Sequence, residues 1–275
     1  MLTSPCFKRN TLFCLLLFMS TQINNSSLIE RLFRVGAHFG FKKSRRHPTV
    51  TTYLFGTKDG NDILDLEKTT ILLSNVKSIL REAGLNGKTV LFVGTKEETS
   101  RLVKLAAEKA EMPYVTNRWI GGMLTNLPEI KKRLLRLETL NKEGESGELE
   151  RKYTKKERVV IGREVDKLSF NFRGISTITK LPDLMVVVDP RYDSIAVKEA
   201  QDMKVPVIGI MGTDSNLAEV TYPVLANDAL QSSVKLVLGE LVDSLLEGKT
   251  QFIPKPITTK PATTGHRQNF VRLNN

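Results

Sequence analysis

Three runs of apolar residues constrain the fold of this chain more than any other feature. They occupy residues 89–93, 184–188 and 205–210, with the sequences Thr-Val-Leu-Phe-Val, Leu-Met-Val-Val-Val and Val-Pro-Val-Ile-Gly-Ile. Nearly every position in these runs is apolar, which is typical of strands buried on both faces of a parallel sheet. A helical pattern separates the second run from the third. Strand-helix-strand units of this kind predict a doubly wound α/β sheet.

Shorter patterns complete an α/β body that we assign to residues 28–126 and 174–248. In chain order they predict an amphipathic helix, the two strands of a hairpin, a second helix and a closing helix: residues 28–33, 53–56, 62–66, 69–83 and 230–246. A glycine that follows a helical pattern commonly ends the helix, so we expect Gly248 to end the closing one.

Two heptad-like seams mark residues 127–173 as an insertion. Apolar side chains recur every three or four residues in both halves: Leu127, Ile130, Leu134, Leu137, Ile161, Val165, Leu168 and Phe172. A turn is expected at residues 143–147, so the segment should form an antiparallel coiled-coil helical hairpin. At ~1.5 Å per residue each helix would extend roughly 25–30 Å. The hairpin either projects toward RNA or packs against the body.

The two ends of the chain are expected to lie outside the body. Residues 1–27 resemble a secretory signal, but their apolar run is too short to span a membrane and no small-residue cleavage motif follows. We interpret them as a disordered extension or a misassigned start, with Met19 as the alternative first residue; a targeting signal is the competing interpretation. Residues 249–275 contain three prolines, five cations and no acidic residue, which predicts a flexible basic tail.

The distribution of charge favours a polyanionic partner. The chain has 41 Lys and Arg residues against 30 Asp and Glu residues, a net charge of +11. Residues 28–60 contain 7 basic and 2 acidic residues, whereas residues 174–248 contain 5 and 11. Such segregation of positive from negative charge is typical of a protein that binds nucleic acid through a basic surface. We hypothesise that the acidic half faces a protein partner.

The basic segment, residues 37–48, is the strongest indication of RNA contact. Lys42, Lys43, Arg45 and Arg46 are interleaved there with two Phe and two His residues. Glycine and proline residues in and around the segment predict an irregular loop, in which cations reach phosphates and aromatic rings stack or pack. A solvated run of charge is the alternative, but it gives no reason for the aromatic residues.

Two other features leave room for an enzyme or a small-molecule sensor. Gly94 and Thr95 lead from the first apolar run into a helical pattern, and such a turn can bind an anion on free backbone N–H groups. Asp189 and Asp214 follow the second and third runs, so they should meet at the carboxyl edge of the sheet. Neither a histidine nor a glycine-rich phosphate motif accompanies them. We therefore expect no catalysis, no cofactor and no metal ion.

The hinge stretch, residues 117–126, joins the body to the insertion. Its sequence is Asn-Arg-Trp-Ile-Gly-Gly-Met-Leu-Thr-Asn, and it contains the only tryptophan of the chain. The two glycines allow a positive φ or a close approach of two backbones. Thr125 is the expected N-cap of the next helix, and Arg118 is expected to anchor the stretch to RNA or to the core.

These motifs follow one another in the order of a known family. His-Phe-Gly at residues 38–40, Phe-Val-Gly-Thr-Lys at 92–96 and the block Trp-Ile-Gly-Gly-Met-Leu-Thr-Asn resemble the bacterial and organellar family of small-subunit ribosomal protein two. The resemblance extends over about residues 28–246. The chain departs from the family at Phe41-Lys42 and Arg46-His47, where the family usually has His-Gln and Trp-Asn, and at residues 212–214, where Gly-Thr-Asp replaces Asp-Thr-Asn.

The resemblance implies a flavodoxin-like sheet with the helical hairpin and a structural, non-catalytic role in translation, as a constituent of the small ribosomal subunit. Implied partners are small-subunit rRNA, ribosomal protein one and other small-subunit proteins, with no membrane and no homo-oligomer, in the cytoplasm or an organelle. The competing hypothesis is an α/β enzyme or sensor that binds a phosphorylated small molecule at the strand ends. The residues we predict to contact RNA are His38, Lys42, Lys43, Arg45, Arg46, Lys96, Arg118 and Trp119.

Overall fold

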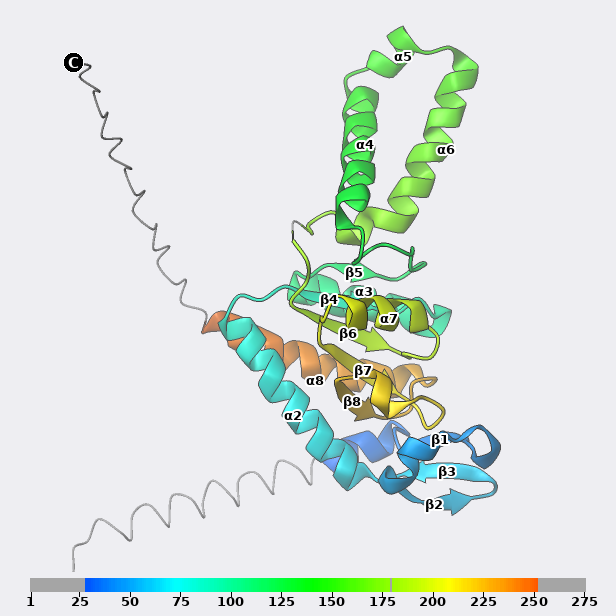
Figure 1. Cartoon of the computed structure of the whole chain (residues 1–275), viewed down its shortest axis with the longest axis vertical. Coiled ribbons are helices and arrows are strands. Elements are labelled where there is room, and N and C mark those ends of the chain that lie inside the picture. Colours follow the sequence, from blue (N-terminus) through cyan, green and yellow to red (C-terminus); the bar gives the residue numbers. More distant parts are fainter. Residues whose placement is uncertain (1–27, 179, 252–275) are drawn as a thin grey trace, which may run out of the picture.

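Five parallel strands form the central sheet of the protein, which a computed structural model describes over residues 28–178 and 180–251 (Figure 1). The strands are β4 Val90–Val93, β5 Tyr114–Val115, β6 Leu184–Val188, β7 Val207–Met211 and β8 Tyr222–Leu225. They lie in the order β5-β4-β6-β7-β8. Counted along the chain, this is the 2-1-3-4-5 order of flavodoxin-like sheets, so the predicted parallel α/β sheet is confirmed.

Helices cover both faces of this sheet. One apolar cluster joins the sheet to the helical segment of residues 28–34 and to three longer helices, and α7 Ser194–Asp202 contributes to the cluster on the opposite face. The three longer helices of the first cluster are α2 Leu66–Leu85, α3 Glu97–Ala110 and α8 Gln231–Thr250. Every residue of β4, β6 and β7 is buried, which explains why their sequences are apolar throughout rather than alternating.

The prediction that Gly248 ends the closing helix is wrong. Helix α8 continues through Gly248 to Thr250, so it includes two residues that we had assigned to the tail. A Cβ at position 248 would lie 2.2 Å from the carbonyl oxygen of Arg81 in α2. The glycine therefore lets the backbones of α2 and α8 pack directly against each other.

A second, antiparallel sheet lies beyond β8, at the lower end of Figure 1. Its strands are β1 Phe39–Lys42, β2 Leu54–Lys58 and β3 Asn61–Leu64, in the order β1-β3-β2. The predicted hairpin is confirmed: Asp59 and Gly60 turn the chain between β2 and β3 with φ values of 52° and 78°. A helical segment, residues 28–34, precedes this sheet.

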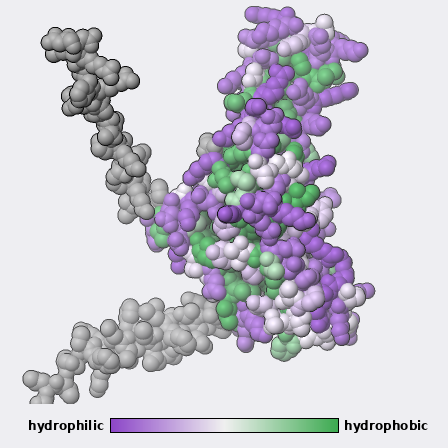
Figure 2. Space-filling view, in the orientation of Figure 1, coloured by the Kyte–Doolittle hydropathy of each residue, from purple (hydrophilic) through white to green (hydrophobic). Residues whose placement is uncertain are grey.

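The helical hairpin extends from the β5 edge, at the opposite end of the molecule (Figure 1). It consists of α4 Leu127–Glu145, the short α5 Glu148–Lys152 and α6 Lys155–Phe172, followed by the 3-10 helix η3 Arg173–Ile175. Residues 143–145 of the expected turn still belong to α4, and the chain turns at the end of the expected range, at Gly147, which has φ 70°. On the face visible in Figure 2, hydrophilic residues cover most of the hairpin.

Apolar contacts hold the two long helices of the hairpin together. The buried side chains are Ile130, Leu134, Leu137 and Leu140 of α4 with Ile161 and Phe172 of α6. An ion pair between Arg136 Nε and Glu164 Oε1, 3.7 Å apart, bridges the same helices. Most of the predicted seam is therefore buried, although Leu127, Val165 and Leu168 are only half-buried.

The N-terminal extension of residues 1–27 and nearly all of the basic tail, residues 252–275, lie outside the described residues. Within the described helices, none is long and apolar enough to cross a membrane.

Candidate nucleic-acid interface

The basic segment is regular structure rather than the predicted irregular loop. It comprises β1, the 3-10 helix η1 Lys43–Arg45 and the start of the 3-10 helix η2 Pro48–Tyr53. The backbone N–H of Phe41 donates to Thr213 Oγ1 at 2.9 Å, which ties the segment to the end of β7. A Cβ on Gly40 would lie 2.5 Å from Thr213 Cγ2. Gly40 thus permits close packing, and the cations project from a fixed backbone.

A second attachment fixes the other end of the basic segment. The N–H of His47 donates to the carbonyl oxygen of Thr213 at 2.9 Å. Thr49 Oγ1 accepts from the N–H of Leu217 at 3.2 Å, in the 3-10 helix η4 Leu217–Glu219. Both bonds join the segment to the chain between β7 and β8. The basic segment is therefore part of the α/β body.

Three of the four predicted cations face solvent. Lys42, Lys43 and Arg45 are exposed. The guanidinium carbon of Arg45 lies 5.1 Å from the centroid of the Phe41 ring, within the range of a cation–π contact. Arg45 Nη2 also lies 3.9 Å from Asp214 Oδ2, yet 57% of the Arg45 side chain remains exposed. These three side chains form a small basic surface at the end of the second sheet.

Arg46 has internal partners, and its contact with phosphate stays a prediction. Its Nε donates to Asp62 Oδ2 at 2.7 Å, its Nη2 donates to Asp62 Oδ1, and Nη2 also donates to Thr57 Oγ1 at 3.0 Å. Asp62 is fully buried. The hydrogen bond from Arg46 is the largest contribution to the lowered pKa of the Asp62 carboxyl, although burial opposes it. The pair stabilises the β2–β3 hairpin.

His38 is held in an aromatic stack. Its ring centroid lies 4.5 Å from that of Phe33 and 4.0 Å from that of Phe39. Burial lowers the pKa of the imidazole below its ordinary value, so the ring is neutral at physiological pH. His38 therefore supplies no positive charge for a phosphate.

Trp119 is a core residue, and its contact with RNA stays a prediction. Only 7% of it is exposed, and its Nε1 donates to Glu199 Oε1 at 3.1 Å. The indole N–H is its only hydrogen-bond donor, and that donor is already used. The neighbouring Arg118 is exposed, so the hinge stretch does present a cation at the surface.

A single carboxylate organises the hinge stretch. Glu199 accepts from the N–H of Gly122 at 2.8 Å and from that of Leu124 at 3.1 Å, in addition to the Trp119 indole. Gly122 turns the chain there with φ 93°. Thr125 N and Oγ1 lie at the limit of hydrogen bonding to the same carboxylate, each at 3.5 Å. The N-cap of α4 is Asn126, so the predicted Thr125 cap is wrong.

The sequence of α7 contains a weak signal for the role of Glu199. Glu199 lies between the buried Val197 and Ala200 in α7, and is itself only 8% exposed. A carboxylate in a strongly apolar helical pattern requires internal donors. The pattern does not reveal the donors, because they lie 75–80 residues earlier in the chain.

The crevice between β4 and β6 is filled by the protein's own charged groups. This is the topological switch point, where flavodoxin-like folds bind ligands. The N–H and hydroxyl of Thr95 donate to Asp193 at 3.1 and 2.6 Å, so a carboxylate of the chain occupies the anion position. Lys96 Nζ pairs with Asp189 Oδ2 at 3.1 Å. Burial lowers the pKa of Lys96, but Asp189 and Asp228 outweigh this and raise it. Lys96 is therefore ion-paired within the protein, and its contact with RNA stays a prediction.

The strand-end carboxylates do not form a catalytic pair. Asp189 is paired with Lys96, whereas Asp214 is paired with Arg191 at 2.6 Å. Asp228, in the connection after β8, is only 1% exposed, and neither of its oxygens accepts a hydrogen bond from another residue. Burial, followed by repulsion from Asp189, raises its pKa to about 7. Among the described residues, no group of three His, Cys, Asp or Glu side chains could hold a metal ion.

Comparison with known proteins identifies the family. A sequence model of the family described as "Ribosomal protein S2" matches residues 32–248, which include the basic segment, the hinge stretch and the hairpin. This chain belongs to the ribosomal protein S2 family.

Relatives in this family come from both bacteria and plastids. The chain is 39% identical over 220 residues to "Small ribosomal subunit protein uS2c" of Rhodomonas salina, covering 80% of this chain and 90% of the relative. It is 39% identical over 221 residues to "Small ribosomal subunit protein uS2" of Sulfurimonas denitrificans, covering 80% and 85%. For the uS2 protein of Thermus thermophilus, identity is 37% over 221 residues, covering 80% and 86%.

Proposed function

We infer that this S2-family chain is a structural constituent of the small ribosomal subunit, where it binds rRNA and neighbouring ribosomal proteins. The observation that carries this conclusion is the family match over residues 32–248, together with relatives named as small-subunit proteins. The S2 family is structural and non-enzymatic. Because the relatives are bacterial and plastid proteins, the ribosome concerned is that of a bacterial cytoplasm or an organelle. Contact with ribosomal protein one stays a prediction.

We propose that Lys42, Lys43, Arg45 and Arg118 contact rRNA. All four are exposed. The first three project from a strand and a 3-10 helix that are hydrogen-bonded to the end of the central sheet. Little of the backbone therefore has to become ordered when RNA binds. Arg118 lies in the hinge stretch that Glu199 holds in place.

The helical hairpin offers a second surface for RNA. Residues 127–173 carry 13 basic and 9 acidic residues, and the long helices extend away from the sheet (Figure 1). We propose that this hairpin is an arm that lies along rRNA. Its buried seam accounts for the apolar residues of the two helices, so the charged faces remain available for contact.

The enzyme or sensor hypothesis is not favoured. The turn after β4 is occupied by Asp193, and the cation beside it is paired with Asp189. A phosphorylated ligand at this position would have to displace two internal carboxylates, and family membership points to a structural role.

A salt titration tests the contribution of the basic segment. The triple variant Lys42→Ala, Lys43→Ala and Arg45→Ala should bind small-subunit rRNA more weakly, and the slope of log K against log salt should fall by roughly 2–3, because each phosphate contact contributes about 0.7–0.9. The control variant replaces three exposed lysines elsewhere on the body with Ala, namely Lys88, Lys198 and Lys235. Both triple variants then have the same net charge. Equal slopes in the two triple variants would remove the basic segment from the RNA interface.

A further inference from the structure

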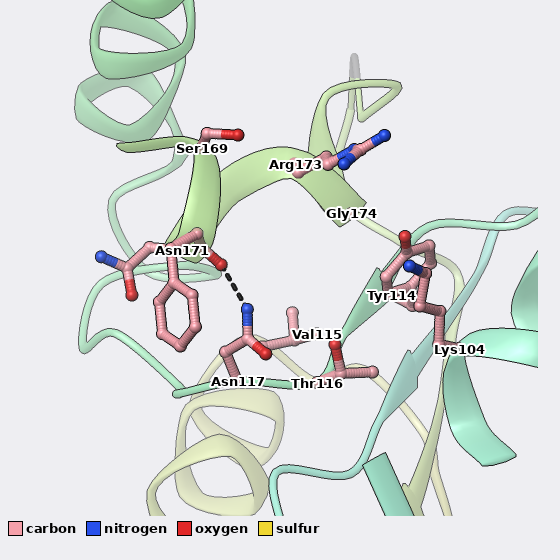
Figure 3. A pocket seen from close by; sticks show the side chains of 10 residues that line it. Lys104, Tyr114, Val115, Thr116, Asn117, Ser169, Asn171, Arg173 and Gly174 are labelled. Carbon is pink, nitrogen blue, oxygen red and sulfur yellow. Dashed lines mark hydrogen bonds between the residues drawn. The ribbon is translucent and has the colours of Figure 1, made fainter. Parts of the chain in front are cut away.

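A cleft of about 220 Å³ lies where the hairpin returns to the sheet. One wall is the end of β5 and the residues that follow it, and the other is the end of α6 with η3. Figure 3 shows side chains from both walls around the cleft: Tyr114, Thr116 and Asn117 from the first, and Ser169, Asn171 and Arg173 from the second. Residues about 55 positions apart in the chain thus line two sides of one cleft.

Two contacts hold the walls in place. Asn117 Nδ2 donates to the carbonyl oxygen of Phe170 at 2.5 Å, which joins the end of α6 to the hinge stretch (Figure 3). Gly174 packs directly on β5, since a Cβ there would lie 2.2 Å from the carbonyl oxygen of Tyr114. The cleft is therefore a fixed feature of the junction between hairpin and body.

The cleft is lined by groups that recognise an unpaired nucleotide. Lys104 and Arg173 are exposed cations, and none of the ten lining residues is acidic. The Nδ2 atoms of Asn117 and Asn171 each donate one hydrogen bond to a backbone carbonyl oxygen, which leaves a second N–H and the amide oxygen of each for base edges. Phe170 is 62% exposed despite its apolar ring. An exposed ring beside amides and cations is the combination with which proteins stack and read unpaired RNA bases.

The size and charge of the cleft limit what can occupy it. Its volume is smaller than the ~300 Å³ at which sites for drug-sized ligands begin, so it suits one planar group better than a whole free nucleotide. Lys104 Nζ lies 3.9 Å from Glu108 Oε1, just outside the lining, whereas no carboxylate of the lining pairs with Arg173. The positive charge of the lining favours a partner that brings its own phosphates.

We propose that this cleft receives one unpaired nucleotide of small-subunit rRNA. The base lies against the Phe170 ring and the asparagine amides, and the flanking phosphates lie against Lys104 and Arg173. This inference rests on the proposed ribosomal function, and it adds a specific contact to the electrostatic binding of the basic segment.

The test uses small subunits that lack their own S2-family protein, reconstituted with this full-length chain. The double variant Phe170→Ala and Arg173→Ala removes the ring and one cation; both side chains are exposed, so the fold should be unaffected. Bases of the rRNA are then probed chemically. We expect the variant to join the particle within about twofold of the unmodified protein, while one or two unpaired bases gain at least about threefold in reactivity.

The control variant, Ile195→Ala and Lys198→Ala, removes an exposed apolar side chain and an exposed cation from α7, outside the surfaces proposed to contact RNA. It should leave those bases protected. The proposal is overturned if the cleft variant and the unmodified protein give the same reactivity pattern, or if the cleft variant loses cross-links to a neighbouring protein while rRNA protection is unchanged. Failure of the unmodified protein to join the particle would instead overturn the proposed function.

Discussion

Replacing Asp228 with Asn should stabilise the fold at alkaline pH and change it little at acidic pH. Asp228 is only 1% exposed, and neither carboxylate oxygen accepts a hydrogen bond from another residue. Asp189 and Asp214 repel its charge, and Lys96 offsets this only in part. The carboxylate form is therefore unfavourable in the folded protein, whereas an amide has the same shape without the charge.

The size of the effect follows from the difference in pKa. The pKa of Asp228 rises from its ordinary value of 3.8 to about 7 on folding. Each pH unit corresponds to about 1.4 kcal/mol, so the ionised group destabilises the folded state by up to about 4 kcal/mol above pH 7. Between the two pKa values the folded state binds more protons than the unfolded state. Stability should therefore fall as the pH rises through this window and level off above it.

Urea unfolding at pH 4.5, 6 and 8 measures this dependence directly. We expect Asp228→Asn to be more stable than the unmodified protein at pH 8 by a few kcal/mol, with the difference shrinking toward zero at the lowest pH. The control Asp202→Asn removes an exposed carboxylate from α7 and should show no such pH dependence. A stability difference that is constant with pH, or a destabilised variant at pH 8, would refute the reasoning.

Two further substitutions test the packing of the body. Glu199→Ala leaves the Trp119 indole and two backbone N–H groups without partners, so it should lower the free energy of unfolding by at least ~3 kcal/mol and shift the emission of the only tryptophan; Asp202→Ala on the same helix should do neither. Gly248→Ala should lower the free energy of unfolding by about 1–3 kcal/mol, because the added methyl group would clash with the carbonyl oxygen of Arg81. Gly239→Ala, in the same helix with open space around it, should instead stabilise by up to ~1 kcal/mol. Denaturant unfolding that ranks the two glycine variants equally would contradict this account of α2–α8 packing.

The central sheet could be predicted because its strands are defined by their own sequences. β4, β6 and β7 are buried on both faces, and an unbroken run of apolar, mostly β-branched residues has few alternatives. The apolar seams of the hairpin were equally predictable, because helical spacing alone identifies the buried side of each helix. The edge strand β5 has only two residues and gave no comparable signal.

The structural role of a glycine could not be predicted where that role depends on a residue far away in the chain. The sequence predicts that Gly40 lies in an irregular loop and that Gly248 ends a helix, whereas each permits a close approach to another segment, Thr213 in one case and Arg81 in the other. Local sequence shows that a side chain is absent but not which atoms fill the space.

The candidate site was only partly predictable for a similar reason. Lys42, Lys43 and Arg45 are exposed as expected, but Arg46 in the same run is paired with the buried Asp62. Sequence alone does not distinguish a cation that is exposed to solvent from one that is paired with an internal carboxylate. Trp119 shows the same limit, because its partner Glu199 lies 80 residues away.

Co-sedimentation of the full chain with small ribosomal subunits that lack their S2-family protein is the most direct test of the central claim. We expect stoichiometric binding in a sucrose gradient, and weaker binding of the Lys42, Lys43 and Arg45 triple variant as salt is raised. A chain that stays at the top of the gradient at low salt, under conditions where another S2-family protein binds, would contradict the account.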